Sequence, residues 1–170
     1  AIIQIVKRLA LAHPNIDFVL THESKEILRY KKPQDAGDNL KARVSAVLGK
    51  EFMDNSTEVN FAKDEIEIYG YTSLPTFNKA TAEEQYLFVN NRPLKDKILN
   101  VALKVAYQDF MARDRQSLCA IFIKIPPKYV DVNVHPAKTE VRFYDPQSIR
   151  NMVISSIKSA LNNTGYRVSN

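Results

Sequence analysis

Glycine is scarce in this 170-residue chain, and the four glycines lie far apart at positions 37, 49, 70 and 165. They cannot form a G-x-G-x-x-G turn or a G-x-x-x-x-G-K-[ST] loop, the two common glycine-rich cradles for phosphate groups. The sequence therefore excludes a nucleotide site of either kind within these residues.

Patterns for metal binding and nucleophilic catalysis are missing as well. His13, His22 and His135 have no metal-ligand spacing to one another or to the single cysteine, Cys119. No G-x-S-x-G motif occurs. Cys119 lies in the apolar stretch 117–125, which predicts a small core residue and a reducing, cytoplasmic compartment. We expect no complete active site and no metal in this chain.

Long apolar runs are also absent, since none approaches the ~20 residues that a membrane span needs. The chain is 45% hydrophobic and 25% charged, which is typical of a soluble globular domain. Lys and Arg outnumber Asp and Glu by 24 − 19 = 5, and the sequence pI is about 9.2. This excess favours a polyanionic partner. Because the chain opens on Ala1 without a start methionine, we expect a fragment of a longer protein.

Apolar residues at helical spacing predict four helices, over 2–12, 39–48, 94–110 and 147–161. Asp38 is placed to cap the second helix and Gly49 to end it. The third helix is predicted to bury one apolar stripe: Leu94, Ile98, Val101, Ala102, Val105 and Ala106.

Strand-like alternation accounts for most of the remaining chain. A hairpin is expected from 16–20 and 26–30, and a second strand pair from 58–63 and 65–71. Residues 118–125 are apolar on both faces, as expected of a central strand. Further strands are predicted at 85–89, 130–134 and 141–143. Four aromatic residues at strand spacing are predicted to pack a sheet: Tyr69, Tyr71, Tyr86 and Phe88. This order of elements predicts an α/β or α+β layer structure.

Two motifs carry more specific information: QYLFVNNRPL at 85–94 and VDVNVHPAKTEVRF at 130–143. Together with RLALAHP at 8–14 and YGY at 69–71, they resemble the MutL family of DNA mismatch repair proteins over about residues 2–161. The resemblance implies the second, transducer domain of a GHKL-type ATPase region. Its fold is a two-layer α/β (α+β) sandwich similar to a ribosomal small-subunit protein.

In domain terms, the resemblance implies a transducer domain over 1–161 and a loose tail over 162–170. The upstream GHKL nucleotide-binding domain and the C-terminal dimerisation domain of the family are expected to be absent from this chain. No enzymatic activity is expected of the fragment alone.

Lys138 is the predicted ATP-sensing residue. In the family, the matching lysine reaches a neighbouring ATP site and contacts the terminal phosphate, which implies a cofactor-binding and catalytic role for Lys138 in the full-length protein. ATP and Mg²⁺ are the cofactors implied there. Asn133, His135 and Pro136 are expected to shape the loop that presents this lysine.

Arg92 is the first predicted DNA contact, because the matching residue of the family lies in a positively charged DNA-binding groove. Lys95, Lys97 and Lys104 follow it along the chain and are predicted to bind DNA phosphates as well. The family usually has glycine where Asn91 stands, and asparagine is the best substitute if the turn needs a positive φ.

The resemblance implies further partners: non-specific DNA through its phosphate backbone, a MutS-type mismatch recognition protein, and a second copy in a homodimer, but no membrane. Two alternatives remain open at this stage. One is the transducer domain of another GHKL ATPase, such as a type II topoisomerase subunit. The other is a free-standing nucleic-acid-binding module without a link to ATP.

Overall fold

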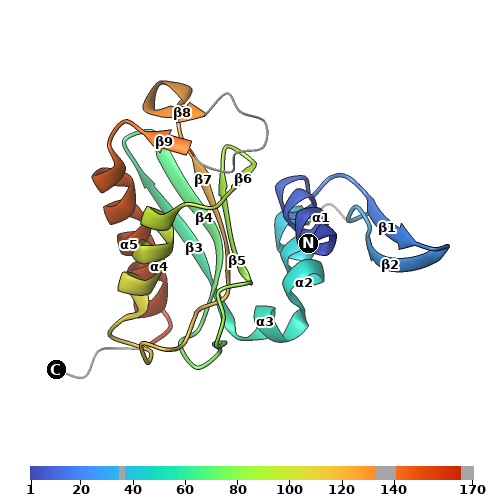
Figure 1. Ribbon diagram of the computed structural model, residues 1–170. Coiled ribbons are helices and arrows are strands. Elements are labelled where there is room, and N and C mark those ends of the chain that lie inside the picture. Colours follow the sequence, from blue (N-terminus) through green and yellow to red (C-terminus); the bar gives the residue numbers. More distant parts are fainter. Residues whose placement is uncertain (35–36, 133–140, 166–170) are drawn as a thin grey trace. The chain divides into compact units, whose positions relative to one another are not determined.

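The computed structural model describes residues 1–34, 37–132 and 141–165 (Figure 1). Contacts within the chain divide it into two compact units, Ala1–Asp54 and Asn55–Asn170. The length of the chain had predicted a single domain, and the sequence did not indicate this division. Each unit has its own helices, strands and hydrogen bonds.

The first unit contains three helices and a hairpin: α1 (Ile2–Ala12), β1 (Phe18–His22), β2 (Lys25–Tyr30), α2 (Asn39–Leu48) and α3 (Lys50–Asp54). The predicted helix over 2–12 and the predicted hairpin are confirmed, whereas α3 was not predicted. The hairpin turns at Glu23 and Ser24, whose φ angles are 48° and 63°. Positive φ at both turn residues matches the right-handed twist of the flanking strands.

The ends of α2 follow the predicted capping chemistry. The Oδ1 atom of Asp38 accepts a hydrogen bond from the backbone N–H of Lys41 at 3.1 Å. Gly49 ends the helix with a φ of 101°, a conformation that glycine adopts without steric cost. Both signals are local, which is why the sequence alone could locate this helix.

Arg43 is the largest fully buried side chain of the first unit, with 1% of its surface exposed. Its guanidinium donates to the carbonyl oxygens of Ala10, His13 and Ile16 at 2.8, 3.2 and 2.6 Å. These carbonyls lie at and after the end of α1, where helical carbonyls lack partners within the helix. Burial lowers the pKa of Arg43 from its ordinary value. Arg43 thus fastens α2 to the end of α1.

The second unit is built on a five-stranded sheet. Its strands are β3 (Ser56–Lys63), β4 (Ile66–Ser73), β5 (Gln85–Val89), β6 (Arg92–Leu94) and β7 (Cys119–Lys124). Their spatial order is β3-β4-β7-β5-β6, and all neighbours are antiparallel except β5 and β7. The predicted pairing of β3 with β4 and the central position of β7 are confirmed. The short edge strand β6 was not predicted.

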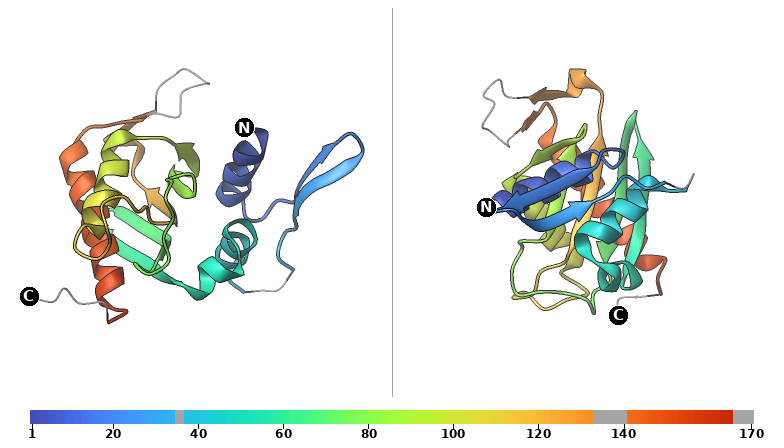
Figure 2. Two further views of the ribbon diagram at one scale, coloured as in Figure 1. Left: turned by 60° about the horizontal axis from the view of Figure 1, so that its bottom comes forward. Right: turned by 90° about the vertical axis from the view of Figure 1, so that its right-hand side faces the viewer.

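Two helices, α4 (Lys97–Tyr107) and α5 (Pro146–Asn162), lie side by side on one face of this sheet (Figures 1 and 2). The chain is completed by a short 3₁₀ helix, η1 (Pro127–Tyr129), and by the paired strands β8 (Val130–Val132) and β9 (Val141–Phe143). Helices and sheet enclose one apolar core, whose members include Ile68, Leu87, Leu103, Ile121, Val153 and Ile157. The predicted two-layer α/β (α+β) sandwich is confirmed for this unit.

The predicted inner face of α4 was wrong in part. Ala102 and Ala106 are buried as predicted, but Ile98 and Val101 are 41% and 53% exposed. The rest of the buried stripe was not predicted: Leu99, Leu103 and Tyr107. The prediction began the stripe at Leu94, which lies in β6 and therefore could not set the phase of the helix. Because apolar residues occur on both sides of α4, contacts with the sheet and α5 decide which side is buried.

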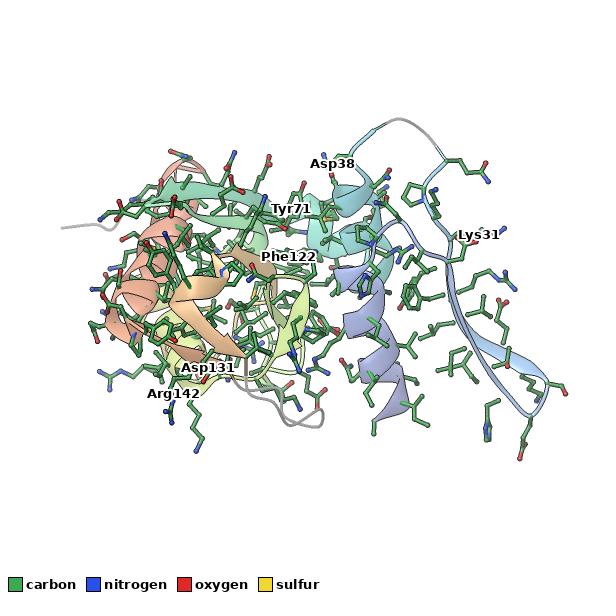
Figure 3. The ribbon with its side chains drawn as sticks, turned by 90° about the horizontal axis from the view of Figure 1, so that it is seen from above. Lys31, Asp38, Tyr71, Phe122, Asp131 and Arg142 are labelled. Atoms are coloured by element: carbon green, nitrogen blue, oxygen red, sulfur yellow. The ribbon has the colours of Figure 1, made fainter. Side chains whose placement is uncertain are left out.

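The opposite face of the sheet carries aromatic rings. The ring of Phe122 stacks on those of Tyr69 and Phe88, with centroids 5.4 and 4.6 Å apart. Figure 3 labels Phe122 of β7 and Tyr71 of β4. The prediction that these aromatic residues pack a sheet is confirmed. Gly70 of β4 has a φ of 134°, and a Cβ atom there would lie 2.0 Å from the carbonyl oxygen of Ala120 in β7. Only glycine fits this close strand approach.

Cys119 is fully buried in the core of the second unit, as predicted. Burial raises the pKa of its thiol to about 12. The thiol is therefore neutral at physiological pH and behaves as a small apolar residue.

Candidate nucleic-acid interface

The hairpin that joins β5 to β6 presents the first predicted DNA contact. Val89 pairs with Arg92, so Asn90 and Asn91 alone form the turn. Their φ angles are 49° and 63°, which matches a type I′ turn. The turn therefore does need a positive φ at Asn91, the condition under which asparagine is the best substitute for glycine. Asparagine tolerates this conformation better than other non-glycine residues.

Arg92 is the first residue of β6, the edge strand next to β5. Its side chain is half-buried. Pro93 follows it, and proline is accepted in an edge strand because no neighbouring strand needs its missing N–H group. The backbone of the hairpin thus holds Arg92 at the border of the sheet.

Three lysines continue from the hairpin into α4. Lys95 and Lys97 are exposed on either side of Asp96, whose carboxylate caps the helix by accepting from the N–H of Leu99 at 3.1 Å. Lys104 is also exposed and lies seven residues after Lys97. Seven residues are about two helical turns, so the two lysines share one face roughly 10 Å apart.

These four basic residues have no ion-pair partner within the described parts of the chain. Lys79 differs from them, because its Nζ atom lies 2.8 Å from a carboxylate oxygen of Glu84. The unpaired charges follow one another along the chain through the turn and the exposed face of α4: Arg92, Lys95, Lys97 and Lys104. The three lysines are exposed and Arg92 is half-buried. Cations without an ion-pair partner at a protein surface are the electrostatic feature that phosphate backbones bind.

Tyr107 fixes the helix that carries two of these lysines. Its hydroxyl lies 2.5 Å from the carbonyl oxygen of Ser73 and 2.6 Å from the hydroxyl of Thr72, both at the end of β4. All three residues are almost completely buried. The sequence did not predict this anchor, because the partners are more than 30 positions apart.

Lys138 lies outside the described residues, as do Asn133, His135 and Pro136. The described strands on either side of this segment, β8 and β9, are antiparallel, and Asp131 is opposite Arg142 (Figure 3). The predicted role of Lys138 therefore stays a prediction.

Metal-ligand side chains do not cluster among the described residues. No group of three or more His, Cys, Asp or Glu side chains among them is placed to hold a metal ion. Of the helices in the same part of the chain, none combines the length and apolarity that crossing a membrane requires. The predicted DNA contacts lie on the β5–β6 hairpin, on α4 and on the short segment between them.

Comparison with protein families matches residues 44–162 to the family described as "DNA mismatch repair protein, C-terminal domain". The matched range begins within α2 and covers most of the second unit. Among curated proteins, the DNA mismatch repair protein MutL of Rickettsia bellii is 55% identical over 170 residues. The alignment covers 99% of this chain and 28% of that protein. The chain thus spans little more than a quarter of its curated relatives.

Solved structures show the same fold at low sequence identity. The N-terminal domain of a DNA repair protein matches with a TM-score of 0.77 and 18% identity, covering 98% of this chain and 54% of the other. The Aquifex aeolicus MutL ATPase domain complexed with ADP matches with a TM-score of 0.54 and 23% identity, covering 89% and 45%. In both matches, this chain corresponds to about half of a larger ATPase or repair domain.

Proposed function

Because the chain belongs to the MutL family of DNA mismatch repair proteins, we propose that it is the transducer part of a longer ATPase. In this proposal, residues 1–161 form the transducer region and 162–170 its tail, with a boundary between two units at Asp54. The region contributes a DNA-binding surface and one phosphate-contacting lysine. The family match favours this function over that of a topoisomerase subunit, which would share only the fold.

The observation that carries the DNA-binding proposal is the set of unpaired cations described above: Arg92, Lys95, Lys97 and Lys104. They lie on the β5–β6 hairpin and on and just before α4, and no acidic side chain in the described part of the chain forms an ion pair with them. Flexible cations of this kind contact phosphates and read no bases, so binding should be weak, insensitive to DNA sequence and steeply dependent on salt.

Arg92→Glu tests this surface in the intact protein that carries the chain. The change should weaken binding equally for DNA duplexes of different sequence and reduce the salt slope by about 1. The matched control is Lys63→Glu, which changes the net charge by the same amount on the exposed end of β3, the opposite edge of the sheet. Fluorescence anisotropy at several salt concentrations gives both quantities. Equal affinities and slopes for wild type and Arg92→Glu would place the DNA surface elsewhere.

Lys138 is proposed to act on ATP that is bound with Mg²⁺ by another part of the whole protein. No cluster of metal-ligand side chains occurs among the described residues, and the sequence has no glycine-rich phosphate loop. A lysine supplies a mobile positive charge that can stabilise a terminal phosphate.

Two ATPase measurements test this role. The purified 170-residue chain should not hydrolyse ATP, because a single lysine replaces neither a phosphate cradle nor a metal site. In the intact protein, Lys138→Ala should lower the turnover rate and leave the unfolding temperature unchanged. Unchanged turnover in the Lys138→Ala variant would remove Lys138 from this role. Hydrolysis by the 170-residue chain alone would contradict the proposal that another part of the protein binds ATP and Mg²⁺.

A MutS-type mismatch recognition protein and a second copy of the whole protein complete the proposed set of partners. Their support is the membership in the mismatch repair family. Co-sedimentation of the intact protein with a MutS-type protein on mismatched DNA, with and without ATP, tests whether this region belongs to such an assembly.

A further inference from the structure

The end of β5 is joined to β7 by an asparagine side chain. These two strands are parallel, and their last ladder pair is Val89 with Ile123. The backbone N–H of Asn90 still donates to the carbonyl oxygen of Ile123 at 2.8 Å. Beyond this point β5 turns back into β6, so its backbone can no longer pair with the next residues of β7.

The side chain of Asn90 continues the ladder where the backbone leaves it. Its Nδ2 atom donates to the carbonyl oxygen of Ile125 at 2.9 Å, and its Oδ1 atom accepts from the N–H of Ile125, also at 2.9 Å. Ile125 is 3% exposed, so its two backbone groups need partners within the protein. One carboxamide satisfies both.

Few residues could replace this asparagine. A carboxamide has a donor and an acceptor on one carbon, whereas a carboxylate has only acceptors and would repel the carbonyl of Ile125. The φ of 49° at position 90 also disfavours most other side chains. Glycine would accept the backbone angle but remove both hydrogen bonds.

We propose that Asn90 is a positioning residue for Arg92, two positions later in the same turn. This inference rests on the proposed function, because it assumes that Arg92 contacts DNA. The strand that begins with Arg92 has only three residues and lies at the edge of the sheet. The two-point contact with Ile125 fixes the turn to the central strand β7, and so holds the guanidinium of Arg92 where a phosphate can bind it.

The neighbouring residue supplies a matched control. Asn91 lies in the same turn, has a similar φ of 63° and is exposed. Its side chain does not form a hydrogen bond with Ile125. Like Asn90→Gly, the variant Asn91→Gly replaces an asparagine of this turn by glycine, but it keeps the hydrogen bonds between Asn90 and β7.

A double-mutant cycle in the intact protein separates positioning from general support of the fold. The probe is a fluorescein-labelled random-sequence DNA duplex, and the variants are Asn90→Gly, Arg92→Ala, their combination, and Asn91→Gly. Arg92→Ala and Asn90→Gly should each weaken binding by roughly fivefold, as for the loss of one exposed charge contact. The combination should be no more than about twofold weaker than Arg92→Ala alone, and Asn91→Gly should stay within about twofold of wild type.

Asn90→Asp provides a second arm that keeps the size of the side chain and its tolerance of positive φ. It should lose affinity to a similar extent at neutral pH, with circular dichroism confirming the fold of each variant. Wild-type affinity of the Asn90→Asp variant would overturn the positioning role. The same holds if the double variant loses affinity by the product of the two single losses of Asn90→Gly and Arg92→Ala. If Arg92→Ala itself leaves binding unchanged, the proposed DNA surface fails and the inference fails with it.

Discussion

Replacing Tyr107 by phenylalanine removes one oxygen atom from the centre of the second unit. The tyrosine is 1% exposed, and burial raises the pKa of its hydroxyl well above the ordinary value, so it remains a donor. Its single proton is donated to the carbonyl oxygen of Ser73, 2.5 Å away. The hydroxyl of Thr72, at 2.6 Å, must then donate to Tyr107. The phenylalanine variant leaves both partners buried without this oxygen.

The expected cost follows from these two lost interactions. Each buried polar group that loses its partner costs about 1–3 kcal/mol, so the variant should lose roughly 2–4 kcal/mol of unfolding free energy. For a unit of this size, that loss corresponds to a melting temperature lower by roughly 10 °C. Urea denaturation followed by circular dichroism measures the free energy directly.

Two companion variants make this test specific. Tyr144→Phe removes the same atom from a side chain that is 71% exposed, and should change the free energy of unfolding by less than about 0.5 kcal/mol. Thr72→Val combined with Tyr107→Phe removes the stranded donor, so the double variant should lose less than the sum of the single losses. A Tyr107→Phe variant as stable as Tyr144→Phe would refute this account of how α4 is anchored.

Two further substitutions and one labelling experiment test other parts of the structure. Gly70→Ala should lower the free energy of unfolding by at least about 3 kcal/mol, because the new Cβ would lie 2.0 Å from the carbonyl oxygen of Ala120. An unchanged urea midpoint would contradict this close approach. Arg43→Met removes the guanidinium that donates to three carbonyls of the first unit, of which that of His13 keeps a bond from the N–H of Ile16. The change should cost about 3 kcal/mol and speed amide exchange at the end of α1. Wild-type exchange would show that the guanidinium is dispensable. Burial raises the pKa of Cys119 to about 12, so at pH 8 its thiol is neutral and should react with a thiol reagent only after unfolding in urea; prompt labelling of the folded chain would contradict its burial.

Local chemistry explains the elements that the sequence located well. The helix α2 begins after a capping aspartate and ends at a glycine, and both signals lie within a few positions of the bonds they make. The apolar run that became β7 indicated a central strand, because only a strand buried on both faces needs apolar residues throughout. The positive φ of Asn91 could be expected for the same reason, since a two-residue turn requires it.

The sequence by itself determined the family, the two-layer fold, most helices and strands, and the order of the predicted DNA contacts along the chain. Only the tertiary structure decided which side of α4 is buried, how Arg43 fastens α2 to α1, and how Asn90 joins the turn before Arg92 to β7. Asn90 and Ile125 are 35 positions apart, as are Thr72 and Tyr107. Residue spacing and secondary-structure propensity predict hydrogen bonds between residues that are close in sequence. Hydrogen bonds between distant residues depend on how whole helices and strands pack, which the folded structure alone shows.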